Sequence, residues 1–472
     1  MGIPSVFNTG RSGMMAAKAA IATTGHNISN ANAEGFNRQR VQQSADAARN
    51  GIGNNLIGQG VHINRVERFN DEYIEKQIRN SNRDVSHLEE KDMALRQTED
   101  VFNELGGDGL NRLMSKFFNE FRQLANDPNN EAIRQSVREA SQALTNDFHR
   151  IHTEVDEVRK HIDAKLEGYV GEVNALSDQI KDLNLEIKKL EVSGASPNDL
   201  LDRRDLALKK LGSYLDLSMH KDADGAFIID VKGVGPLVVG PQAEKFSVFR
   251  SKEDDQGKAE ASLDIRTTAS ANGKVTHALK GGKLGALIEV RDQTLSTVLD
   301  RLDELAFNLT ESVNDIHTQG FTRNGDQGVH YFKPIEDKAR AAEFIDLSDA
   351  VKLSVNHIAT AAQADAPSDN RIAIAISGLQ GERLMSNGQT TMDDFFNSIV
   401  SDIGVAGSRT RQSMNQAKDI QTQLGKMREQ LSGVSIDEET ANLMQFQHAF
   451  DASARVVSVA DEMLKTVLDL RR

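Results

Sequence analysis

Both ends of the chain carry small or apolar residues that recur at alternating intervals of three and four. In an α-helix this spacing places every member on one face, as in the seam of a coiled coil. We therefore predict an N-terminal helix that stops near Gly35, because glycine is the usual residue just past a helix end. The N-terminal set is Ile3, Phe7, Gly10, Met14, Ala17, Ile21, Thr24 and Ile28.

The C-terminal end repeats the pattern in a second predicted helix. Its large apolar residues lie seven apart, and a companion position is interrupted at Glu439 and Ser453. Each large side chain is worth about 1.5–3 kcal/mol when it is buried, so both seams need a partner. That partner is either the other terminal helix of the same chain or a helix of a neighbouring subunit. The C-terminal set is Ile436, Leu443, Phe450, Val457 and Leu464, with Phe446, Ala460 and Val467 at the companion position.

From these two seams we predict an assembly interface. Its expected residues are the larger apolar members of both sets: Ile3, Phe7, Met14, Ile21, Ile28, Leu443, Phe446, Phe450, Val457, Leu464 and Val467.

Between the terminal helices the pattern changes twice. Residues 70–190, 284–319 and 391–431 have helical periodicity, including a long heptad run after residue 150, whereas residues 214–280 alternate and contain turn residues. Short alternating stretches within residues 36–69 predict strands or extended loops. We expect a mainly α protein with an inserted β-domain, in which a long helical bundle is closed by the paired terminal helices. The expected domains are 1–45 with 432–472, 46–213 with 281–431, and 214–280.

Composition argues against several classes of protein. The formal net charge is −14 and no Lys/Arg-rich run is present, which disfavours binding to nucleic acids and to anionic membranes. The absence of cysteine excludes disulfides and thiolate metal sites. No apolar run reaches the ~18–20 residues of a membrane span. The first twelve residues lack the features of a cleavable signal peptide.

No set of residues predicts catalysis, a cofactor site or a metal site. His149 and His152 lie three apart without the remaining ligands of a zinc motif. Asp222 and Asp224 lack the closing glutamate of a calcium loop, and Gly281-Gly282-Lys283 lacks the spacing of a phosphate loop. The polar stretch Asn324–Gly328 is more simply a turn. We therefore expect a protein that is not an enzyme.

Several stretches nevertheless carry a specific resemblance. Asn27–Gln39 resembles the N-terminal signature of the flagellar axial proteins, the subunits of rod, hook and hook-associated layers. Ser432–Leu443 resembles the C-terminal signature of the hook-associated family whose members join hook to filament. The stretches Gly194–Asp205, Leu284–Asp292 and Gly320–Phe332 also resemble that family, in the same order. Phe36 and Asn37 replace the Tyr and the Thr or Ser that are frequent there.

The resemblance implies a structural subunit of the hook–filament junction. Its implied partners are copies of itself in a ring or helical layer, the hook protein, the next hook-associated junction protein and the filament. It further implies type III export without a cleaved signal, an extracellular location in the flagellum, and an export chaperone that binds the C-terminal helix. The expected chaperone contacts are Phe446, Phe450, Val457 and Leu464. The alternatives are another axial subunit, from hook or distal rod, and a secreted binding protein on the same scaffold.

Overall fold

The computed structural model describes residues 3–47, 49–50, 56–102, 109–221, 227–250, 263–267, 273–366 and 368–469. The contacts between residues divide the chain into two compact units. Unit 1 comprises Met1–Ser86, Val170–Gly282 and Gln416–Arg472, and unit 2 comprises His87–Tyr169 and Lys283–Asn415.

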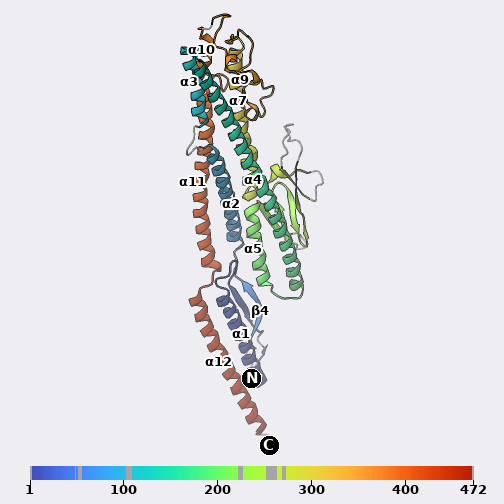
Figure 1. Ribbon diagram of the computed structural model, residues 1–472. Coiled ribbons are helices and arrows are strands. Elements are labelled where there is room, and N and C mark those ends of the chain that lie inside the picture. Colours follow the sequence, from blue (N-terminus) through green and yellow to red (C-terminus); the bar gives the residue numbers. More distant parts are fainter. Residues whose placement is uncertain are drawn as a thin grey trace. The chain divides into compact units, whose positions relative to one another are not determined.

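In unit 1 the two terminal helices lie side by side, as Figure 1 shows. They are α1 (Ile3–Ser29) and α12 (Ile436–Asp469). The predicted pairing of terminal helices is therefore present within one chain. Helix α1 ends six residues before Gly35, which has a left-handed φ of 83° in the turn that follows. Strands β1 (Gln39–Ala45) and β4 (Val61–Arg68) then form an antiparallel pair, and β2 (Arg49–Asn50) pairs with β3 (Leu56–Ile57).

The predicted β insertion is confirmed in unit 1, directly after helix α5 (Asn198–Tyr214). Four antiparallel strands follow in sequential order: β5 (Leu217–Lys221), β6 (Phe227–Val231), β7 (Gly235–Val239) and β8 (Gln242–Ala243). Strands β9 (Phe246–Arg250) and β10 (Leu263–Thr267) pair separately, and a 3₁₀ turn, η2, spans Thr276–Ala278. Ile229 and Val238 are fully buried, so the sheet has its own apolar contacts. Asp222 and Asp224, which were considered for a calcium loop, lie outside the described residues.

Three long helices contribute residues to both units. They are α2 (Glu72–Phe102), α4 (Glu131–Val192) and α11 (Met392–Ser432). The heptad pattern in α4 predicts most of its buried face: Val155, Ile162, Val173 and Ile180 are buried, whereas Tyr169 and Leu176 are half-buried and Leu190 is exposed. The helices are long because the chain contains only seven prolines to interrupt them. One of these, Pro128, lies in the break between α3 and α4.

Unit 2 packs around an aromatic cluster. Phe117 and Phe121 of α3 (Leu110–Asn126) meet Tyr331 edge to face, and Phe332 lies against Phe117. The remaining elements are α6 (Gly282–Glu289), the π-helix η3 (Val290–Leu295), α7 (Ser296–His317), α8 (Ala341–Phe344), α9 (Asp349–Leu353), η4 (Val355–His357), α10 (Arg371–Gly378) and η5 (Leu379–Gly381). Tyr331 and Phe332, at the end of the predicted polar turn, thus belong to the core of this unit.

The two units divide the chain differently from the three expected domains, because the β-rich residues 214–280 group with the terminal helices. The finer three-part division stays a prediction. Within the described ranges, no helix combines the length and the apolarity needed to cross a membrane.

His317 is a buried titratable group in the core of unit 2. Its Nδ1–H donates to the carbonyl oxygen of Val329 at 2.7 Å, and its Nε2 accepts from the amide of Ala359 at 2.8 Å. A protonated ring could not accept the second bond. Burial, which disfavours the charged form, lowers the pKa of His317 to about 4.

We expect His317 to make unit 2 acid-sensitive. In the unfolded chain an ordinary histidine gains a proton near pH 6.5, whereas the folded protein resists protonation down to about pH 4. The contribution of His317 to the free energy of unfolding is therefore fully present above pH 6.5. It falls by about 3 kcal/mol between pH 6.5 and pH 4. Denaturant unfolding over this range should show a smaller pH dependence for His317→Gln. His330→Gln, at an exposed position, should retain most of the dependence, because burial lowers the pKa of His317 more than the charge of His330 does. An unchanged slope in His317→Gln would contradict the assignment.

Candidate assembly interface

The buried residues of α1 are mainly small. Ala16, Ala17, Ala20 and Thr24 are buried, and Gly10 is buried where α1 meets α12. A Cβ atom on Gly10 would lie only 2.7 Å from a methyl group of Val457, so glycine permits the close approach of the helices here. The larger predicted residues, Phe7, Met14, Ile21 and Ile28, are only half-buried, and the side chain of Ile3 lies outside the description.

The face of α12 follows the predicted heptad over most of its length. Leu443, Phe446, Phe450, Val457 and Leu464 are half-buried, and Ala460 is fully buried. Ser453, which the pattern treats as an interruption, faces Gly10 and Gly13. Two positions differ from the heptad: Ile436 and Val467 are more than half exposed. Most of the predicted seam is thus occupied by the other terminal helix, and its role between subunits stays a prediction.

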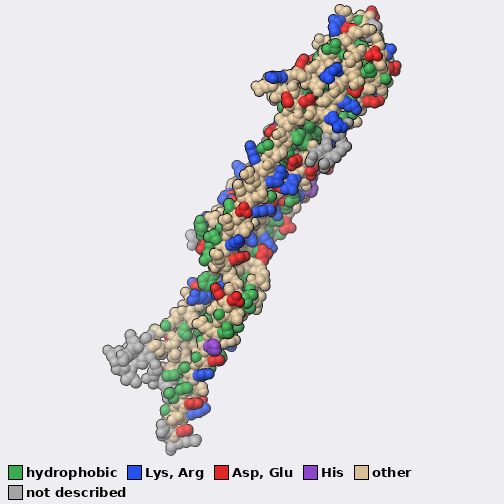
Figure 2. Space-filling view, turned by 90° about the vertical axis from the view of Figure 1, so that its left-hand side faces the viewer, with side chains coloured by type: hydrophobic (Ala, Val, Ile, Leu, Met, Phe, Trp, Pro, Cys, Tyr) green, Lys and Arg blue, Asp and Glu red, His purple; other side chains and the backbone are tan. Residues whose placement is uncertain are grey.

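A second apolar row lies on α12 beside the seam. Val456, Val459, Met463 and Val467 are spaced by three, four and four residues, which places them on one face of the helix. They are 40–52% exposed. We call these four residues the outer stripe. Figure 2 shows hydrophobic side chains at the surface of the molecule, interspersed with charged ones, on the face that it presents.

The contact between the end of α1 and the start of α12 is polar and depends on Glu439. Its side chain is only 2% exposed. One carboxylate oxygen accepts from Asn27 Nδ2 at 2.9 Å, and the other pairs with Arg38 Nη2 at 2.6 Å. A buried carboxylate is costly unless it is paired in this way, so the contact joins the end of α1, the start of β1 and the start of α12.

Asn27 also shapes the turn between α1 and β1. Its Oδ1 accepts from the backbone amide of Gln39 at 2.9 Å, and its Nδ2 donates to the carbonyl oxygen of the same residue at 2.8 Å. The amide of Arg38 donates to the carbonyl oxygen of Ser432, the last residue of α11, at 3.1 Å. Backbone groups near the end of the signature segment Asn27–Gln39 therefore bind both the Asn27 side chain in α1 and the last residue of α11.

Asn37 extends the network to α5 and α11. It donates to Asp202 through its backbone amide at 3.1 Å and through Nδ2 at 2.6 Å, while its Oδ1 accepts from Arg428 at 3.1 Å. Arg68 of β4 pairs with Asp202 at 2.9 Å and with Asp205 at 2.6 Å. Burial raises the pKa of Asp202, although the hydrogen bonds from Asn37 and Arg68 oppose the rise.

We call this network the polar joint: Asn27, Asn37, Arg38, Asp202, Arg428 and Glu439. It brings together three stretches that lie far apart in the sequence, namely Asn27–Gln39, Gly194–Asp205 and Ser432–Leu443. All three are stretches on which the family resemblance rests.

The remaining residues that were candidates for a metal site make contacts within the fold. His149 Nε2 lies 2.8 Å from the carbonyl oxygen of Ile345, and His152 lies 3.9 Å from a carboxylate oxygen of Glu343. The amides of Asn324 and Asp326 donate to the hydroxyl of Thr322, which makes this stretch a turn. Among the described residues, no group of three or more His, Asp or Glu is placed to hold a metal ion.

Comparison with known proteins decides the family. The model of the flagellar hook-associated protein FlgK helical domain matches residues 95–332, which is half of the chain. The chain belongs to the FlgK family of flagellar hook-associated proteins. The ends of the chain match two further models: residues 7–37 match the flagella basal body rod protein model, and residues 430–470 match the C-terminal model of the basal body rod FlgEFG proteins.

Relatives match the FlgK-family chain over nearly its whole length. It is 29% identical to flagellar hook-associated protein 1 of Bacillus subtilis, over 98% of this chain and 97% of the relative. It is 26% identical to flagellar hook-associated protein 1 of Escherichia coli, over 99% and 100%. The flagellar hook junction protein FlgK of Burkholderia pseudomallei superposes with a TM-score of 0.66 at 16% identity, over 75% of this chain and all of that structure, so it supports the fold.

Sequence patterns missed most members of the polar joint. The heptad pattern treats Glu439 as an interruption of a hydrophobic seam, and it assigns no role to Asp202 or Arg428. One signal was available, since Asp199, Asp202 and Asp205 recur every third residue and so form a carboxylate row along α5. Arg68, the cation that binds Asp202 and Asp205, lies more than 130 residues from them, and no local pattern identifies it.

We expect Glu439→Ala to destabilise the helix pair far more than Glu438→Ala. The first change leaves Asn27 and Arg38 without their buried partner, at a cost of about 2–4 kcal/mol. Glu438 binds the same arginine but is 64% exposed, so its loss should cost at most about 0.5 kcal/mol. Hydrogen exchange of α1 and α12 amides measures the difference. Equal protection in the two variants would refute the role of Glu439.

Proposed function

We propose that this chain is a structural subunit of the bacterial flagellum that forms the junction between hook and filament and acts by self-assembly. The observation that carries this proposal is the match to flagellar hook-associated proteins 1 over nearly the full length of both chains. The match of the FlgK helical domain over residues 95–332 disfavours a hook or distal rod subunit. The same matches disfavour a secreted binding protein, and we propose no catalytic role.

The outer stripe supports self-assembly. Pairing of α1 with α12 uses the heptad seam and leaves Val456, Val459, Met463 and Val467 exposed on one face. An exposed row of apolar residues on a helix is typical of a surface that another helix covers. We infer that the predicted interface has two parts, an inner seam within each subunit and the outer stripe between subunits in a ring or helical layer. The hook protein, the next hook-associated protein and the filament are the proposed neighbours of this layer.

The same helix is the proposed site for an export chaperone. Phe446, Phe450, Val457 and Leu464 are half-buried by the pairing with α1. A chaperone that binds these residues must therefore displace α1, so chaperone binding and pairing of the termini exclude each other. This competition is consistent with our proposal that the chain is exported unfolded by the flagellar type III route, without a cleaved signal, and pairs its termini outside the cell.

Deletion of the gene should leave hooks without filaments and release flagellin into the medium, because no subunit would connect the two structures. Electron microscopy of cells and an immunoblot of the culture supernatant measure both effects, and the intact gene on a plasmid is the control. Normal filaments in a strain that carries no second copy would overturn the proposed function.

A charge in the outer stripe should block assembly without unfolding the subunit. We expect Val459→Asp to export normally and to fail in filament attachment, because it places a carboxylate where another apolar surface packs. Ser458→Asp introduces the same charge one residue earlier, about 100° around the helix and outside the stripe. Motility and filament counts measure the difference. Equal loss in both variants, or in neither, would remove the outer stripe from the interface.

A further inference from the structure

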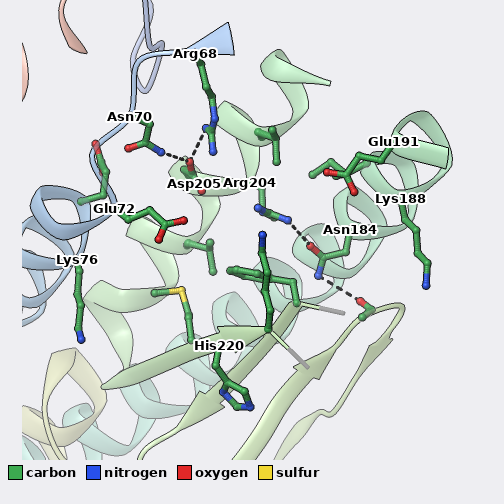
Figure 3. A pocket seen from close by; sticks show the side chains of 18 of the residues that line it. Arg68, Asn70, Glu72, Lys76, Asn184, Lys188, Glu191, Arg204, Asp205 and His220 are labelled. Carbon is green, nitrogen blue, oxygen red and sulfur yellow. Dashed lines mark hydrogen bonds and ion pairs between the residues drawn. The ribbon is translucent and has the colours of Figure 1, made fainter. Parts of the chain in front are cut away.

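Unit 1 contains a wide cleft that the assembly of the terminal helices does not use. It has a volume of about 1210 Å³ and lies among β4, the start of α2, the end of α4, α5 and the strands that follow. Figure 3 shows its polar side chains, which come from several of these elements. The volume exceeds the roughly 300–1,000 Å³ of a small-molecule pocket, so the cleft suits a chain segment better than a metabolite.

The cleft reverses the charge balance of the protein. Acidic residues outnumber Lys and Arg in the whole sequence by 70 to 56, but in the lining six cations face four carboxylates. Two of the four are already engaged, since Glu75 pairs with Arg428 and Asp205 pairs with Arg68. The six cations are Arg68, Lys76, Arg79, Lys188, Arg204 and Lys221; the carboxylates are Glu72, Glu75, Glu191 and Asp205.

Two of these arginines are incompletely satisfied. The Nε atoms of Arg79 and Arg204 are shielded from solvent and have no hydrogen-bond partner. Arg204 makes one weak contact with Asn184 at 3.3 Å and stacks on the ring of Phe227 at 4.3 Å, and neither partner is charged. Burial lowers the pKa of both arginines more than the surrounding carboxylates raise it. A buried guanidinium in this state is stabilised by any carboxylate that enters.

The cleft also contains a free hydrogen-bond acceptor and exposed apolar side chains. Asn70 Oδ1 is buried without a hydrogen-bond donor, although its Nδ2 contacts Asp205 at 3.4 Å. A free carboxylate cannot supply that donor, whereas a peptide backbone amide can. Tyr73 and Val192 line the same cleft and are 70% and 82% exposed, so an aliphatic side chain would find contacts there.

We propose that this cleft binds an acidic peptide segment of a neighbouring protein subunit, whose carboxylates are received by Arg79 and Arg204. A backbone amide of the segment donates to Asn70, and an aliphatic side chain lies against Tyr73 and Val192. The identification of the neighbour as a subunit of the flagellum rests on the proposed function; the chemistry of the cleft does not.

Binding can be measured on the purified full chain with a labelled short peptide of alternating leucine and glutamate. We expect affinity that falls with added salt, and a loss of about tenfold or more in Arg79→Gln and in Arg204→Gln. Arg203→Gln, an exposed position on the same helix that does not line the cleft, should bind like the unchanged protein. Equal binding of a leucine–glutamine peptide, or an equal loss in Arg203→Gln, would overturn the proposal.

A second readout separates a binding residue from a structural one. Arg79 makes no ion pair in the described part of the chain. Arg79→Gln should therefore raise the melting temperature by about 2 °C or more, and it should also weaken peptide binding. A lower melting temperature would mean that Arg79 supports the fold and would count against the site. Citrate is the competitor: if it binds as tightly as the peptide, the ligand is a free carboxylate and the assignment to a protein segment fails.

The two proposals can fail independently. Peptide binding uses isolated protein and needs no flagellum, whereas the deletion experiment needs no peptide. Loss of filaments on deletion together with no peptide binding would remove the cleft and retain the junction function.

Discussion

The buried carboxylate of Glu439 is the interaction on which the arrangement of the terminal helices depends. The buried residues of α1 are mainly alanine, glycine and threonine, and such a surface has few features that distinguish one register of the helix pair from the next. Glu439 meets Asn27 and Arg38 in one register only, and any slip would leave the carboxylate buried and unpaired. We infer that the polar joint sets the alignment of α1 with α12, while the apolar seam supplies most of the stabilising contact.

The polar joint also explains why distant signature segments occur together. Asn37 uses three of its hydrogen-bonding groups at once, as backbone donor, side-chain donor and side-chain acceptor. A hydroxyl at this position could not reproduce both side-chain bonds with the same reach, so asparagine is more than a neutral replacement. Through Asp202 and Arg428 the end of the signature segment is fixed to α5 and α11. The terminal helices are thereby anchored to the rest of unit 1 by hydrogen bonds rather than by apolar contact alone.

Two surfaces of the single chain lack the partners that their side chains require. The outer stripe exposes apolar side chains, and the cleft holds arginines whose buried nitrogens lack partners. Both features cost stability in an isolated protein, and both are relieved when a complementary surface arrives. The stripe would receive an apolar helix face, whereas the cleft would receive an acidic segment. Such a division allows two different neighbours to be recognised by one subunit.

The sequence by itself determined the elements and their order. Heptad spacing identified α1, α4 and α12, and alternation with turn residues identified the β insertion, because periodicity is a local property of the chain. It also identified most of the seam, including Phe450, Val457 and Leu464. Only the tertiary structure decided that Glu439 belongs in the seam, that Val467 is exposed, and that Asn37 meets Asp202 and Arg428. These outcomes depend on which distant charges and amides lie within about 3 Å of one another, and hydrogen bonds of that reach leave no periodic trace in the sequence.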